Sequence, residues 1–90
     1  MDVVVDPPKD AANLAKHGLS LGEAAGFDFA SALIREDRRF NYGEQRMQAL
    51  GWLGGRLVVP IYVDIDDDTV RAISLRPADS REWKAYGDHL

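Results

Sequence analysis

The strongest strand signal in the chain is the run Leu57-Val58-Val59-Pro60-Ile61-Tyr62-Val63, which is rich in β-branched and aromatic residues. Because proline has no backbone N–H, Pro60 predicts a bulge or a position at which that group would face away from a neighbouring strand. Gly54-Gly55, just before the run, is typical of a two-residue hairpin turn. The run therefore predicts one strand of an antiparallel meander.

Three further stretches predict the other strands of this meander: residues 32–38, residues 46–53 and residues 70–76. In residues 46–53, alternation of side chains places one set on a single face: Met47, Ala49, Gly51 and Leu53. The acidic residues 64–68 predict the turn before the last strand, and Pro77 ends that strand.

Helices are predicted on both sides of the meander. A short strand at residues 3–5 is followed by Asp6 and two prolines, which begin a helix that closes at Gly18. The Ser20-x-x-Glu23 pattern is a capping box for a second, short helix, and a last helix begins at residues 79–80. The order β-α-α-β-β-β-β-α indicates an α+β fold in a single domain, residues 1–90.

Composition limits the classes of protein to which the chain can belong. Its 90 residues include no cysteine, which excludes disulfides, thiolate zinc sites and cysteine-based catalysis. No apolar run approaches the roughly 20 residues that span a bilayer, and the N-terminus lacks the basic region of a signal peptide. We therefore expect a cytoplasmic protein that has no membrane partner.

Charge is distributed unevenly, although the net charge is only −4. Residues 35–56 hold five arginines against three carboxylates, whereas residues 64–68 hold four aspartates and no base. Arginine binds phosphate in a fork, so the first stretch is compatible with an anion site, although a solvated surface of mixed sign explains the same residues taken singly.

The aspartates of residues 64–68 lack the glycine and the bidentate carboxylate of a calcium loop. His17 and His89 are too far apart in sequence to form a metal motif.

The first candidate site is Lys16-His17-Gly18, at the predicted end of the first helix. Histidine titrates near neutral pH and can move protons, and a neighbouring lysine favours anionic substrates. The same cations also complement the helix macrodipole, and for this pair alone that structural explanation is the stronger one.

The second candidate site lies on the last predicted strand. Simple alternation places Ser74 and Arg76 on one face and Arg71 on the other, so all three share a pocket only if the strand is bulged. A polar outer face also explains them, and for these residues taken alone that structural explanation is the stronger one. Two carboxylate–arginine groupings are either general-base and phosphate-binding pairs or surface ion pairs: Glu44 with Arg46, and Glu36-Asp37 with Arg38-Arg39.

Seven motifs in order extend over nearly the whole chain: Asp6-Pro7-x-Lys9, Asn13-x-x-Lys16-His17-Gly18-Leu19-Ser20, Glu36-Asp37-x-Arg39, Tyr42-Gly43-Glu44-x-Arg46, Leu50-Gly51, Arg71-x-Ile73-Ser74-x-Arg76-x-Ala78 and Glu82-x-x-x-Tyr86. This series resembles the BrnT family of toxins from type II toxin–antitoxin systems. The most specific part is the combination of Asn-x-x-Lys-His-Gly with Ile-Ser-x-Arg downstream.

The resemblance implies a RelE-like fold, with two N-terminal helices packed on a small antiparallel sheet. It also implies a ribonuclease that arrests translation by cutting RNA, either free or on ribosomes, without a metal or another cofactor. The implied partner is a DNA-binding antitoxin of the ribbon-helix-helix type, and we expect exposed apolar surface near Trp52 or Trp83 to anchor it. A homodimer and a toxin–antitoxin heterotetramer both agree with this reading.

Residue roles follow from the chemistry that RNA cleavage through the ribose 2′-hydroxyl requires. Arg46 and Arg76 are expected to stabilise the charge of the phosphorane, and His17 and Glu44 are the acid–base candidates. The remaining candidates are expected to bind substrate: Lys16, Arg39, Arg71, Ser74 and Tyr86. Tyr86 would stack on or orient a base, although taken alone its ring is better explained by packing in the core or at an interface. This hypothesis requires His17, Arg46 and Arg76 to face one point.

A non-catalytic interaction module is the alternative. Such a degenerate toxin would bind its antitoxin and contribute to transcriptional autoregulation without cleaving RNA. The low number of cations favours it, and so does Pro77, which stands where BrnT-like proteins often have another base after the arginine.

Overall fold

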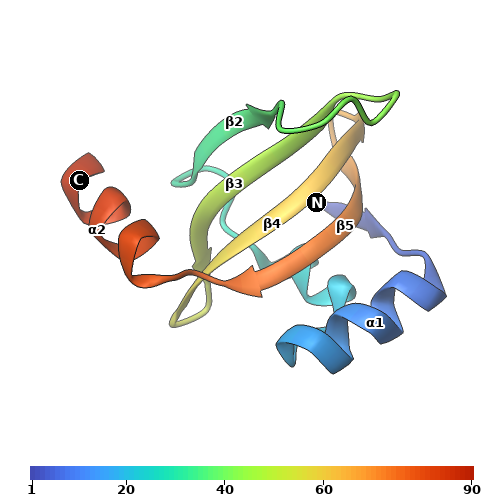
Figure 1. The fold of residues 1–90 in the computed structure, drawn as a ribbon, viewed down its shortest axis with the longest axis horizontal. Helices are drawn as coiled ribbons and strands as arrows, with labels where there is room; N and C mark the ends of the chain where they lie inside the picture. Colours follow the sequence, from blue (N-terminus) through green and yellow to red (C-terminus); the bar gives the residue numbers. More distant parts are fainter.

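The computed structural model describes residues 1–90, and its longest strand, β4 (Arg56–Asp66), contains the run that dominates the sequence pattern. β4 lies at the centre of a five-stranded sheet with the order β1-β5-β4-β3-β2 (Figure 1). β1 pairs with β5 in parallel, and every other neighbouring pair is antiparallel. The remaining elements are β1 (Asp2–Val4), α1 (Pro7–His17), η1 (Leu21–Gly26), β2 (Leu33–Asp37), β3 (Arg46–Leu53), β5 (Thr69–Pro77) and α2 (Ser80–His89).

The α+β class is confirmed, and the elements follow the predicted order with two differences. The expectation of a purely antiparallel sheet is wrong, because β1 docks on β5 in parallel and the sheet is mixed. The other difference is in the second helix. That segment, η1, is a 3₁₀ helix rather than an α-helix. The Glu23 carboxylate accepts the Ser20 backbone N–H at 2.8 Å, as a capping box requires, but the Ser20 hydroxyl donates to Asp10 of α1 at 2.9 Å. Asp10 also accepts the backbone N–H of Leu21 at 2.7 Å. The short helix is therefore fixed to α1 through one carboxylate.

Turns and breaks in the meander occur close to the predicted positions. Gly54 and Gly55 join β3 to β4 as a two-residue turn, with Gly54 at φ 59°. Pro60 interrupts the ladder toward β3, which has no paired residues between the Gln48–Ile61 and Gly51–Val58 pairs. The missing proline N–H accounts for this gap.

A bulge in β5 changes which side chains share a face. Ile61 pairs with Ser74 whereas Tyr62 pairs with Ala72, so Ile73 has no partner on β4. The extra residue shifts the alternation by one position. Arg71 therefore lies on the same face as Ser74 and Arg76, and simple alternation, which separates them, is wrong for this strand.

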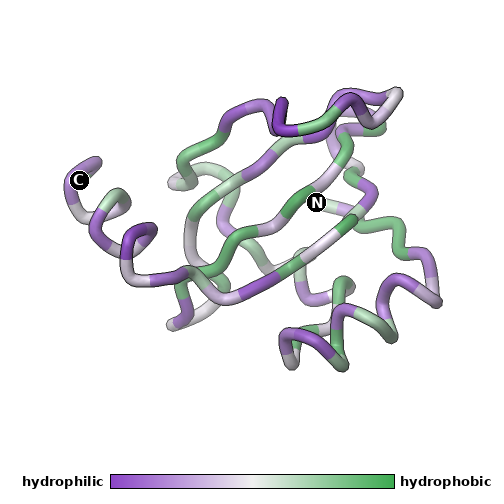
Figure 2. The backbone as a smooth tube through the Cα atoms, in the orientation of Figure 1, coloured by the Kyte–Doolittle hydropathy of each residue, from purple (hydrophilic) through white to green (hydrophobic).

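The hydrophobic core lies on one face of the sheet, where η1 and the segment after it cover the strands. Its members are Leu19, Leu21, Phe27, Ala49, Val58, Tyr62, Val70, Ala72 and Leu75. Met47 and Leu53 pack against this cluster and Gly51 is buried, so the residues predicted to share one face of β3 do so, and that face is the one turned toward the core. Figure 2 shows β4 as mainly hydrophobic and α1 as mainly hydrophilic. In agreement with this, α1 contributes no residue to the core cluster.

Asn13 attaches α1 to the edge of the sheet. Its side-chain amide donates to the Leu75 carbonyl at 2.8 Å and accepts the Leu75 N–H at 3.0 Å, and it also donates to the Leu19 carbonyl at 2.8 Å. β1 pairs with β5 only as far as Arg71. The Asn13 amide therefore takes the place of a strand partner for Leu75.

α2 packs on the opposite face of the sheet from the core. Its capping box is complete, because Asp79 accepts the Glu82 N–H and Glu82 accepts the Asp79 N–H, both at 2.9 Å. The rings of Trp83 and Tyr86 meet Trp52 of β3 edge-on, with centroids 5.5 and 5.7 Å away. Figure 1 shows α2 well apart from α1.

Replacing Asn13 by alanine is expected to lower the free energy of unfolding by about 3 kcal/mol, because it leaves three backbone groups without their partner. Chemical denaturation of both proteins measures this difference. Asn41→Ala is the control, since Asn41 is exposed and its side chain accepts only the nearby Gly43 N–H; we expect a loss below about 0.5 kcal/mol. Equal losses for the two variants would contradict the role assigned to Asn13.

Candidate active site

A cavity of about 260 Å³ opens on the face of the sheet opposite the core. Its lining comes from the end of α1, from β2 and the loop after it, and from β3, β4 and β5. We call it the basic pocket, and its lining residues are Lys16, His17, Asp37, Arg39, Tyr42, Arg46, Ile61, Ile73, Ser74 and Arg76.

Most of the site residues predicted from the sequence meet in the basic pocket: Lys16, His17, Arg39, Arg46, Ser74 and Arg76. His17, Arg46 and Arg76 come from three different elements and line the same cavity. The spatial requirement for a phosphodiester site is therefore met. Glu44, Arg71 and Tyr86 do not line the pocket.

His17 is the last residue of α1, and Gly18 ends the helix in the left-handed conformation at φ 73°. His17 lies one helical turn after Asn13, so the contact between Asn13 and β5 places the imidazole near Arg76. Partial burial lowers the pKa of His17 below its usual 6.5, and the charges of Lys16 and Arg76 lower it further. The imidazole is therefore neutral at pH 7 and able to accept a proton.

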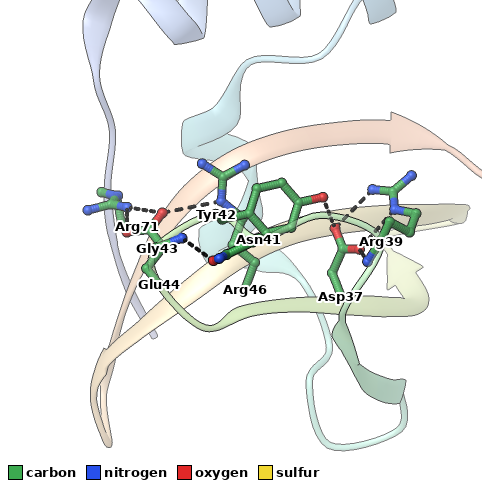
Figure 3. Close-up of polar contacts among 8 residues, drawn as sticks. All are labelled: Asp37, Arg39, Asn41, Tyr42, Gly43, Glu44, Arg46 and Arg71. Carbon is green, nitrogen blue, oxygen red and sulfur yellow. Dashed lines mark hydrogen bonds and ion pairs between the residues drawn. The ribbon is translucent and has the colours of Figure 1, made fainter.

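Asp37, at the end of β2, is a buried carboxylate whose side chain is only 1% exposed. Arg39 donates to it through two nitrogens at 2.8 and 2.9 Å, and the Tyr42 hydroxyl donates to it at 3.1 Å (Figure 3). These hydrogen bonds hold the pKa of Asp37 well below its usual range, chiefly because of Arg39. The carboxylate thus stays ionised and fixes both partners.

Tyr42 joins this carboxylate to a second guanidinium group. The central carbon of the Arg46 guanidinium lies 4.2 Å from the centroid of the Tyr42 ring, a cation–π contact that is also visible in Figure 3. Asp37 therefore orients Arg39 directly and Arg46 through the tyrosine ring.

Glu44 lies behind Arg46, outside the pocket lining. It accepts from Arg46 at 3.2 Å and from Arg71 at 2.6 and 2.8 Å (Figure 3). Arg71 first, and Arg46 second, lower the pKa of Glu44 below its usual value. A paired carboxylate of this kind is a weak base and carries no proton to donate, so the geometry favours a positioning role for Glu44 and a structural role for Arg71.

Arg76 connects the pocket to α2. Its guanidinium donates to the two carboxylate oxygens of Glu82 at 2.7 and 2.9 Å. This pairing raises the pKa of Arg76 and lowers that of Glu82. Each pocket arginine therefore has a carboxylate partner: Asp37 for Arg39, Glu44 for Arg46 and Glu82 for Arg76.

The structure corrects the prediction that Tyr86 stacks on or orients a base. Tyr86 is only 3% exposed, its ring packs against Trp52, and its hydroxyl donates to the Ser31 carbonyl at 3.1 Å. A ring buried in this way has no face available to a nucleotide. Its place in the Glu82-x-x-x-Tyr86 motif reflects the packing of α2.

The sequence pattern singled out Asp37 only as part of the grouping Glu36-Asp37 with Arg38-Arg39, and it did not single out Tyr42. Both occur in the quoted motifs, Glu36-Asp37-x-Arg39 and Tyr42-Gly43-Glu44-x-Arg46. The available signal was an acid two residues before an arginine at the predicted end of a strand. That spacing did not reveal that the carboxylate is buried and accepts hydrogen bonds from both Arg39 and Tyr42.

No cluster of three or more His, Cys, Asp or Glu side chains has the geometry to hold a metal ion. None of the helices combines the length and the apolar character needed to cross a bilayer.

Comparison with known proteins identifies the family. A sequence model for the family described as the ribonuclease toxin BrnT of type II toxin–antitoxin systems matches residues 6–82. The chain belongs to the BrnT family. No curated protein sequence matches it.

A similar solved structure is the 1.1 Å crystal structure of the Brucella abortus ribonuclease toxin BrnT. It is 26% identical in sequence and superposes with a TM-score of 0.69, covering 89% of this chain and 99% of that chain. The motif-based resemblance to BrnT toxins is thus confirmed, and the α+β fold is shared with a BrnT toxin. Membership in a type II toxin family implies an antitoxin partner and an RNA substrate.

The buried carboxylate of this BrnT-family chain makes a prediction about acid stability. Asp37→Asn is expected to lower the free energy of unfolding by about 2 kcal/mol at pH 7, because the amide loses the charge that binds Arg39. The depressed pKa of Asp37 stabilises the fold above the unfolded value of about 3.9, and this contribution is lost as the pH falls through the folded value. The difference between wild type and Asp37→Asn should therefore narrow as the pH falls below about 4.

Urea denaturation over a pH series measures this difference. Asp67→Asn is the matched control, because Asp67 is exposed in the β4–β5 turn; its stability should differ little from that of the wild type at every pH. A gap that stays constant down to pH 2 would contradict the assignment to Asp37.

Proposed function

We propose that this protein is an endoribonuclease toxin that cleaves RNA through the ribose 2′-hydroxyl and thereby inhibits translation. The observation that carries the proposal is the basic pocket, in which one imidazole and three guanidinium groups line the same cavity. Cations of this kind match a phosphodiester and the extra negative charge that develops on it during cleavage. The BrnT family assignment supports the same activity.

In the proposed mechanism the RNA supplies the nucleophile and the pocket moves the protons. Neutral His17 accepts the proton of the 2′-hydroxyl, whose oxygen forms a bond to phosphorus. Arg46 and Arg76 stabilise the phosphorane, and the bond from phosphorus to the 5′-oxygen then breaks. We assign the proton that this oxygen takes up to the Lys16 ammonium, because Glu44 is an ionised partner of two arginines. Arg39 and Ser74 are assigned to substrate phosphate.

The proposal also includes a cytoplasmic location, a RelE-like relationship and a ribbon-helix-helix antitoxin that neutralises the toxin. A homodimer and a toxin–antitoxin heterotetramer remain alternatives for the assembly. Trp83, which is 49% exposed and stacks edge-on against Trp52, supports the proposal that an antitoxin docks near α2.

A second candidate function is a degenerate toxin that only binds its antitoxin. The observation in its favour is that every arginine of the basic pocket already has a carboxylate partner, which weakens the field that attracts RNA. Purified protein incubated with mRNA, with and without ribosomes, separates the two functions. Cleavage in either mixture supports the nuclease, and intact RNA in both supports the interaction module.

Arg76→Ala is expected to reduce RNA cleavage at least about 100-fold, because it removes a donor aimed at the developing negative charge. Growth should recover when this variant is induced in cells. Arg76→Lys keeps the charge but not the forked geometry, so it should restore only part of the activity. Arg81→Ala is the control, since it removes the same charge from the exposed face of α2.

Cleavage rates and growth are compared for variants with wild-type thermal unfolding. An Arg76→Ala protein that stays fully toxic would show that the site is misplaced.

A pH profile tests the role of His17. A general base works only when deprotonated, so log kcat/KM should fall with a slope of one below the pKa of His17, which lies under 6.5, and level off above it. His17→Ala should remove this acidic limb together with most of the activity. His89→Ala should preserve the limb, because His89 lies at the end of α2 and does not line the pocket. A limb that survives in His17→Ala would assign the base to another residue.

A further inference from the structure

The basic pocket is one end of a longer trough on the same side of the sheet. It shares Asp37 and Arg39 with a second hollow, and that hollow shares Arg35 and Gln48 with a third hollow of about 340 Å³ beneath α2. The three hollows therefore adjoin one another in a row between the end of α1 and α2.

The third hollow differs in chemistry from the basic pocket. We call it the apolar groove, and it is lined by Leu33, Ile34, Arg35, Gln48, Ala49, Leu50, Glu82 and Ala85. Aliphatic side chains of β2, β3 and α2 contribute to its walls: Leu33, Leu50 and Ala85. Glu82 belongs to this lining and also binds Arg76 of the basic pocket. A mainly apolar cavity with a few polar groups is the usual form of a site for a small organic ligand.

Two polar side chains lie where the apolar groove meets the second hollow, and neither has a partner within the protein. The Gln48 amide takes part in no hydrogen bond, and Arg35 has no carboxylate partner, unlike Arg39, Arg46 and Arg76. Gln48 therefore offers both donors and an acceptor, and Arg35 offers an uncompensated positive charge.

We propose that the apolar groove binds the nucleobase of the nucleotide next to the cleaved phosphodiester. Gln48 would hydrogen-bond to the edge of that base, and Arg35 would bind the flanking phosphate. The inference rests on the proposed function and adds a sequence preference at one position of a single-stranded RNA. Single-stranded RNA is read in this way, by burying splayed bases and hydrogen-bonding to their edges.

Spacing along β3 agrees with this assignment. Arg46 and Gln48 alternate onto the same face and lie about 7 Å apart along the strand, a distance comparable to one nucleotide step in an extended chain. A phosphate held by Arg46 in the basic pocket thus leaves the neighbouring base within reach of Gln48. Continuity with a phosphate site and a free arginine at the mouth favour RNA over an antitoxin segment as the occupant.

The test compares cleavage of RNA oligonucleotides that differ only in the nucleotide on either side of the cut. For the wild type we expect the best and worst base at one of these positions to differ about tenfold in kcat/KM, the size of one good base contact. Gln48→Leu should bring this ratio close to one, and Gln48→Glu, which replaces the amide donor by an acceptor, should change the preferred base. Arg35→Ala should raise KM similarly for every RNA and reduce the salt dependence of binding.

Arg56→Ala is the matched control for Arg35→Ala, because it removes an exposed arginine at the β3–β4 turn, outside all three hollows. It should leave both the ratio and KM unchanged. Thermal unfolding confirms that each variant is folded. A second readout does not need cleavage: NMR titration with a 2′-deoxy dinucleotide should shift the Gln48 side-chain amide and the methyl groups of Leu33 and Leu50.

The outcomes separate this inference from the proposed function. A wild type that cleaves RNA while Gln48→Leu keeps the full base preference overturns the inference and leaves the nuclease standing. If the protein cleaves no RNA but shows the expected NMR shifts, the proposed nuclease activity is overturned and the base site is supported. Gln48→Leu that weakens only antitoxin binding assigns the groove to the antitoxin, and the absence of both cleavage and shifts overturns both proposals.

Discussion

The contact between the Asn13 amide and the backbone of Leu75 is the constraint on which the site depends. β1 covers only the first part of β5, so the edge of β5 beyond Arg71 has exposed backbone groups that need a partner. An asparagine side chain satisfies both groups of Leu75 and brings α1 against the sheet at that point. One helical turn later, His17 lies over the strand that carries Ser74 and Arg76. A helix that packs with few apolar side chains is thus positioned by hydrogen bonds.

A second principle governs the cations of the basic pocket. Three guanidinium groups in one cavity repel one another, and each is held by a carboxylate that comes from outside the cavity or from its wall. The carboxylates reduce the positive field, but they also fix long flexible side chains before a substrate arrives. Asp37 contributes most to ordering these side chains, because it is buried and also orients Tyr42, whose ring contacts Arg46. The carboxylate pairing therefore weakens the attraction for RNA, but it fixes the geometry of the three arginine side chains.

Local signals were enough to predict most of the fold. The glycine pair at 54–55, the prolines and the capping residues each determine a turn or an end within a few residues, and these features gave the element order. Tertiary features were not predictable in the same way. The bulge at Ile73, which brings Arg71 to the face of Arg76, leaves no mark in an otherwise regular strand pattern. Tyr86 was misassigned because a short terminal helix does not show which of its faces is covered.

The pairing of β1 with β5, the last strand of the sheet in sequence, has a consequence for synthesis. β1 is synthesised before β5, the strand on which it docks. The Asn13 side chain likewise lacks its partner Leu75 until a further 62 residues have been synthesised. During translation β1 therefore has no strand partner, and the pocket lacks one wall, until β5 has left the exit tunnel. The strand that carries Ser74 and Arg76 is thus the last strand of the sheet to be synthesised, so the basic pocket is completed only after the other strands are available.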